Sequence, residues 1–110
     1  MNKLELSSVS LLKDLVENHG VLGIKTSFED EGASLMEVIR LKELCNQAGT
    51  KILLKIAGAE AKRDLEDSMM IGVKGIVAPM IESAFALDKF VKSAKSILHP
   101  DVLSNVQLGV

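Results

Sequence analysis

The chain has 110 residues, of which 47% are hydrophobic, and its formal net charge is −2. This size and composition predict one packed globular domain and exclude an intrinsically disordered chain. Phenylalanine is the only aromatic residue type and the lysines are scattered, so nucleic-acid binding is not expected. No apolar run could span a bilayer, and the amino terminus lacks the apolar segment of a signal peptide. A single cysteine, Cys45, on the apolar side of a helical pattern adds to the expectation of a cytoplasmic protein.

Helical and strand-like patterns alternate along the chain. Apolar residues at helical spacing predict helices that end at glycines or before Pro100, and short apolar runs predict strands between them. Ser34 and Glu37 form a capping box, which places the start of a helix there. The expected helices are 6–19, 34–48, 60–71 and 83–97, and the expected strands are 21–28, 51–56, 75–80 and 105–110.

This alternation predicts an α/β fold with a parallel sheet, and more narrowly a partial (β/α)8 TIM barrel. Successive strands begin roughly 25–30 residues apart, close to the spacing in an eight-stranded barrel of about 250 residues. We expect about three βα units plus a fourth strand in one domain, residues 1–110, as the amino-terminal portion of a barrel. The competing architecture is a small doubly wound domain, which would normally cover its last strand with a helix. Open strand edges also predict self-association into a homo-oligomer.

Strand alternation turns several charged residues toward the expected interior of the barrel. Lys25 and Glu29 alternate with the apolar residues of the first strand, and Lys55 alternates with those of the second. Inward charges are costly unless they are paired or bound to a ligand. We therefore interpret Lys25 and Lys55 as a cationic site for a carboxylate or an enolate oxygen. The alternative is a buried Lys–Glu pair that only fixes the register of the strands.

Further candidates follow the strands, at the edge where parallel α/β proteins bind ligands. Glu29 and Asp30 are candidates for a general base, although a solvated acidic turn before a helix is the simpler interpretation when they are taken alone. Gly58, Glu60 and Met80 are candidates for substrate contacts. Their structural alternatives are a tight turn, a helix amino terminus that favours an acid, and a core filler.

Three segments resemble one enzyme family. They are GIKTSFEDEG at 23–32, LLKIAGAEA at 53–61 and GVKGIVAPMIES at 72–83, of which the last is the most specific. Over about residues 21–95 the chain is similar to the HpcH/HpaI aldolase and citrate lyase β-subunit family, which belongs to the phosphoenolpyruvate/pyruvate-binding TIM barrels. The resemblance implies a metal-dependent carbon–carbon lyase that acts on a small 2-oxo acid or related carboxylate through an enolate.

The resemblance also implies roles for particular residues. Lys55 falls where family aldolases have an arginine that contacts the substrate oxygen, and it keeps the charge without the bidentate fork. Glu29 and Asp30 fall at a Glu-His pair of the family, so an acid stands in place of the histidine base. These two departures favour the alternative interpretation, a non-catalytic binding or assembly module derived from a barrel.

The cofactor is implied by the resemblance alone. Family members use Mg²⁺ or another divalent metal, held by acids that follow later strands. The first of these acids would come just after a strand equivalent to VQLGV, so the ligands are expected beyond Val110 and no metal ligand is assigned within the chain. We accordingly expect the 110-residue chain alone to be inactive.

Overall fold

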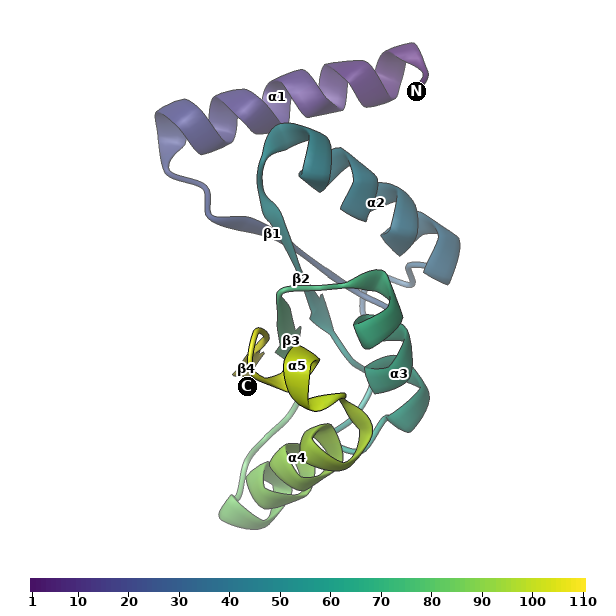
Figure 1. Cartoon of the computed structure of the whole chain (residues 1–110), viewed down its shortest axis with the longest axis vertical. Coiled ribbons are helices and arrows are strands. Elements are labelled where there is room, and N and C mark those ends of the chain that lie inside the picture. The colour runs from purple at the N-terminus through teal and green to yellow at the C-terminus, as the bar shows by residue number, and fades with distance from the viewer.

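A leading helix is followed by three βα units, a short helix and a fourth strand. The computed structural model describes residues 1–110. In Figure 1, α1 lies at one end of the molecule and α4 at the other, with the strands between them. None of the helices combines the length and the apolar character needed to cross a membrane. The elements in chain order are α1 (Lys3–His19), β1 (Gly23–Ser27), α2 (Leu35–Ala48), β2 (Lys51–Lys55), α3 (Lys62–Ile71), β3 (Gly75–Val77), α4 (Ala84–Ile97), α5 (Pro100–Leu103) and β4 (Gln107–Gly109).

The four strands form one parallel sheet in the order β1-β2-β3-β4. The register places Ser27, Lys55, Val77 and Gly109 side by side, so the carboxyl ends of all four strands meet at one edge. The α/β class, the parallel sheet and the βα units with a fourth strand are thus confirmed. The sequential order is that of consecutive strands in a (β/α)8 barrel, whereas a doubly wound sheet reverses its order at a switch point.

The helices cover one face of the sheet and leave the other face open. Ile52 and Leu54 are fully buried, while Leu53 and Lys55, which alternate with them, are only half-buried. Pairing with Leu53 puts Lys25 on the same open face, where it is exposed. The prediction of which strand faces pack against helices is therefore confirmed. The open face is the one that lines the interior when such a sheet closes into a barrel.

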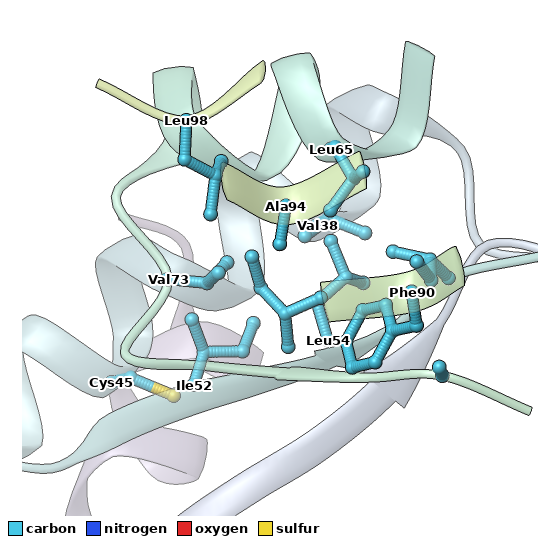
Figure 2. Packing of buried hydrophobic residues seen from close by; sticks show 12 residues of the cluster. Val38, Cys45, Ile52, Leu54, Leu65, Val73, Phe90, Ala94 and Leu98 are labelled. Atoms are coloured by element: carbon cyan, nitrogen blue, oxygen red, sulfur yellow. The ribbon is translucent and has the colours of Figure 1, made fainter. Parts of the chain in front are cut away.

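The main core lies between the sheet and the helices α2, α3 and α4. Figure 2 shows Phe90 of α4 and Leu65 of α3 converging on Leu54 of β2. Cys45 lies beside Ile52 in the same cluster, so its predicted place in the core is confirmed, and burial raises the pKa of its thiol. Each large apolar side chain buried here contributes about 1.5–3 kcal/mol. The cluster consists of Val38, Cys45, Ile52, Leu54, Ile56, Leu65, Val73, Ile76, Ala78, Phe90, Ala94 and Leu98.

Two helices begin at positions other than the predicted ones. α1 begins at Lys3 and not at residue 6, because Asn2 and Glu5 form a capping box. The Glu5 amide donates to the Asn2 side chain over 2.8 Å, and the Asn2 amide donates to the Glu5 carboxylate over 3.0 Å. α3 begins at Lys62 and not at residue 60, because the Asp64 carboxylate accepts from the Ala57 amide over 2.8 Å and holds the preceding residues in a loop.

All four strands are shorter than predicted, and a short helix lies between the last two. β3 ends at Val77 and not at residue 80, because Pro79 has no amide hydrogen for a further ladder bond. α5 occupies part of the segment before β4, and His99 caps its amino terminus by accepting from the Asp101 amide over 3.2 Å. β4 consequently begins at Gln107 and not at residue 105.

Candidate functional site

The candidate residues lie at the carboxyl edge of the sheet, in the loops that follow three strands. Asp30, Gly58 and Met80 each lie three residues beyond the last residue of β1, β2 and β3. Lys55 is itself the last residue of β2 and lies in register with Ser27. Positions distant in the sequence are therefore gathered at the edge where parallel α/β folds place their ligands.

Lys55 and Asp30 form an ion pair that joins β2 to the loop after β1. The Lys55 ammonium group donates a hydrogen bond to a carboxylate oxygen of Asp30. The Lys55 side chain is 24% exposed and that of Asp30 is 54% exposed, so the lysine is the more enclosed partner. This hydrogen bond and the Lys55 charge hold the pKa of Asp30 below its ordinary value. The charge of Lys25 acts in the same direction, which places a second cation within electrostatic reach of Asp30.

The three acids at 29–31 have three different environments. Asp30 is bound to Lys55, whereas Glu31 turns back to β1, where the buried Ser27 hydroxyl donates to its carboxylate. The Glu31 amide also donates to that hydroxyl over 2.9 Å. Glu29 is exposed and forms no ion pair. Because two of the three carboxylates are engaged elsewhere, the run is not arranged as a metal site, and no group of three His, Cys, Asp or Glu residues in the structure could hold a metal ion.

Glu60 is bound to a helix and not to the lysines of the sheet. Its carboxylate lies 3.2 Å from the Lys89 ammonium group of α4. Lys89 also lies 4.7 Å from the centre of the Phe85 ring, within cation–π range. Glu60 has no polar contact with Lys55. The structure therefore brings together Lys25, Lys55 and Asp30 and leaves Glu60 outside that group.

Of the two loop candidates Gly58 and Met80, only Met80 has an unusual backbone conformation. A methyl group added at Gly58 would meet no atom within 4 Å, and the φ angle of Gly58 lies outside the left-handed region, so neither packing nor the turn requires glycine. Met80 has a φ of 50° and is the only non-glycine residue with a positive φ. Met80 is 84% exposed as a residue, so it does not pack in the core, and the expectation of a core filler was wrong. This conformation costs roughly 1–2 kcal/mol, and such strain clusters at functional sites.

Three residues that shape this edge were not predicted. Ser27 anchors Glu31, Asp64 fixes the loop after β2, and Lys89 holds Glu60. Ser27 alone had a sequence signal, because it lies two residues after Lys25, on the same face of β1, and ends the strand. The partners of Asp64 and Lys89 depend on how the loops turn, which the hydrophobic pattern does not specify.

Lys25, Lys55 and Asp30 lie on an open surface of the protein. Five cavities are present, and none is lined by Lys25, Lys55 or Asp30. The fold and the site together define a parallel α/β protein with an ion-paired lysine at the carboxyl edge of its sheet. Comparison of the chain with models of known families, with curated proteins and with solved structures gave no significant match.

Proposed function

We propose that residues 1–110 form the amino-terminal part of a metal-dependent carbon–carbon lyase of the HpcH/HpaI aldolase and citrate lyase β-subunit type. The observation that supports this best is the grouping of Lys25 and Lys55 at the carboxyl edge of a sequentially ordered parallel sheet. A small 2-oxo acid or related carboxylate would bind there, with the ammonium groups stabilising the enolate oxygen. The lone thiol of Cys45, free and buried, supports a cytoplasmic setting.

Within this proposal, Lys55 contacts the substrate and Asp30 positions Lys55. The lowered pKa of Asp30 makes it a weak base at neutral pH, because proton transfer is most efficient when the pKa of the base lies near the working pH. Glu29 is exposed and unpaired, which leaves its carboxylate available for proton transfer. Lys25 contributes positive charge on the open face, and Met80 and Gly58 border the site from the loops after β3 and β2.

The residues present do not form a complete site for Mg²⁺ or another divalent metal. Asp30 is bound to Lys55 and Glu31 to Ser27, so the acids at 29–31 do not converge on one point. The metal of this proposal would therefore need ligands outside residues 1–110, and the residues described here bind and orient the substrate.

The proposal is tested by titrating the ¹⁵N-labelled chain with pyruvate and with oxalate, which resembles an enolate. We expect saturable shifts of the Lys55 and Asp30 amide signals, and we expect Lys55→Met to weaken binding about tenfold. Lys92→Met is the matched control, because Lys92 is also paired with an aspartate, Asp88, at 2.8 Å on α4. Absence of saturation, or an equal effect of the two substitutions, would reject the site. Substantial Mg²⁺-dependent lyase turnover by the 110-residue chain would contradict the expectation that it is inactive alone.

A second candidate function is a non-catalytic binding or assembly module. It is favoured by the Lys55–Asp30 pair, which already neutralises the candidate cation, and by the lack of a cavity at these residues. β1 and β4 each pair with only one other strand, so both edges of the sheet can add a strand from a second copy. Light scattering over a range of protein concentrations tests this candidate. Self-association without carboxylate binding supports the module. A chain that stays monomeric at both low and high protein concentration counts against it.

A further inference from the structure

The largest cavity lies at the opposite, amino-terminal edge of the sheet. It has a volume of about 520 Å³, and we call it the amino-edge cavity. Residues from the starts of three strands line it: Thr50 and Lys51 at β2, Lys74 before β3, and Asn105 and Gln107 at β4. The cavity is shallow and open to solvent, so a ligand would lie against this edge of the sheet without being enclosed. None of these residues belongs to the site proposed above.

The amino-edge cavity is lined by two lysines and by no acid. Lys51 is half-buried, Lys74 is exposed, and neither forms an ion pair. This local positive charge stands out against a chain whose acids outnumber its lysines and arginines, 15 to 13. A cavity lined by two lysines without acid partners favours an anionic ligand.

The remaining polar groups either hold the cavity in shape or are free to donate. The Thr50 hydroxyl donates to the Leu22 carbonyl over 3.2 Å, and the Asn105 side chain donates to the Asp101 carbonyl over 2.7 Å. The Gln107 backbone amide donates to the Lys74 carbonyl over 3.0 Å, which fixes these two residues beside each other. The Gln107 side-chain amide is free, so it joins the two ammonium groups as a donor for phosphate or carboxylate oxygens.

Nearby helix ends do not cancel this charge. α2 is capped by Gly49 and α3 by Gly72, each two residues before one of the two lysines. A helix carboxyl end carries about half a negative elementary charge, so the two ends together offset roughly one of the two lysine charges. Asp101 lines the neighbouring cavity together with Lys74, so the charge that remains for a ligand is at most about +1.

We propose that the amino-edge cavity binds a small organic phosphate. A phosphate monoester has three terminal acceptor oxygens, so it can accept from both lysines and from the Gln107 side-chain amide at once, whereas a carboxylate has only two oxygens. Leu22 also lines the cavity and is exposed, so it offers an apolar contact for the organic part of the ligand. The acidic net charge of the chain disfavours a long polyanion such as nucleic acid.

The test is a titration of the ¹⁵N-labelled chain with glycerol 3-phosphate in a phosphate-free buffer, with glycerol and acetate as reference compounds. We expect saturable shifts of the amide signals of Lys51, Lys74 and Gln107 with glycerol 3-phosphate only. Lys51→Gln and Lys74→Gln should each weaken binding about tenfold. Lys95→Gln is the matched control, because Lys95 is an exposed lysine in the last turn of α4 without an ion pair, and it should leave the affinity unchanged.

Thermal unfolding of the same variants separates binding from a purely structural role. If Lys51 and Lys74 only neutralise helix ends, their substitution lowers Tm, but glycerol 3-phosphate still shifts the amide signals as it does in the unsubstituted chain. That result would overturn the proposal. Shifts that do not saturate, or an equal loss of affinity in Lys95→Gln, would overturn it as well. Equal shifts with acetate would show that the cavity takes any anion and would reject the phosphate assignment.

Discussion

Replacing Gly75 with alanine tests how Leu53 packs on the open face of the sheet. A Cβ atom at Gly75 would lie 2.3 Å from the Leu53 Cδ2 atom. This is roughly 1.2 Å or more inside the separation of 3.5–4.0 Å at which carbon atoms make favourable contact. The added methyl group must therefore displace the Leu53 Cδ2 atom, which is the end of a flexible, half-buried side chain on the open face, so the cost lies near the lower end of the range of about 1–3 kcal/mol for overpacking. The smaller conformational freedom of alanine in the unfolded chain offsets about 0.4–1 kcal/mol of this cost.

We expect Gly75→Ala to lower the free energy of unfolding by about 1 kcal/mol or less and Tm by up to roughly 8 °C, measured by urea and thermal unfolding. The clash should vanish when Leu53 is also replaced by alanine, so Gly75→Ala should cost little in the Leu53→Ala background. Gly58→Ala is the control, because its methyl group meets no atom within 4 Å and its φ is outside the left-handed region. It should be neutral or slightly stabilising. Equal costs of Gly75→Ala in both backgrounds would refute the assigned contact.

Three other substitutions give further predictions. Leu54→Ala, at a fully buried core position, should lower the free energy of unfolding by about 2–5 kcal/mol in urea unfolding, and a loss below about 1 kcal/mol would contradict the packing described. Lys55→Met should raise the pKa of Asp30 toward its ordinary value, as followed by NMR titration of the carboxyl group. Because the folded-state pKa of Asp30 is lowered, the stability from this pair is present above the ordinary aspartate pKa and is lost as the pH falls through the lowered pKa. An unchanged Asp30 titration in the variant would show that Lys55 does not cause the lowered pKa of Asp30. Met80→Gly should leave the free energy of unfolding unchanged or raise it by up to about 1 kcal/mol, since glycine removes the strain of the positive φ and little packing is lost. Clear destabilisation in thermal unfolding would show that the exposed side chain makes a structural contact.

The faces of the strands could be predicted from the sequence, because side chains alternate with a period of two and one face must be apolar to pack against helices. This reasoning placed Lys25 and Lys55 on the open face correctly. Helices with several turns of apolar spacing were also predicted, and the capping box at Ser34 gave the start of α2 to within a residue. α5 was not predicted, because four residues contain too little periodicity to identify a helix.

The partners of the charged residues could not be predicted from alternation. A buried Lys–Glu pair was one expectation, but Lys55 pairs with Asp30. The choice among neighbouring acids is made by the loop after β1, where Ser27 binds Glu31 and so directs Asp30 toward β2. Such side-chain bonds to nearby backbone depend on local turn geometry, and the hydrophobic pattern carries no information about it.

The open face has an arrangement of large and small residues that bears on the proposed barrel. Leu53 lies between two strands that each contribute a glycine, since a Cβ at Gly23 would be 3.1 Å from its Cδ1 atom and one at Gly75 would be closer still. Glycine inside a strand costs about 0.5–1 kcal/mol relative to alanine, so two such positions are tolerated only if the space beside them is used. Alternation of large and small side chains across neighbouring strands is how barrel interiors are filled. On an uncovered face Leu53 can rotate away from a new methyl group, but under a covering layer it cannot. A cost of Gly75→Ala that rises with protein concentration would therefore indicate that a second copy covers this face.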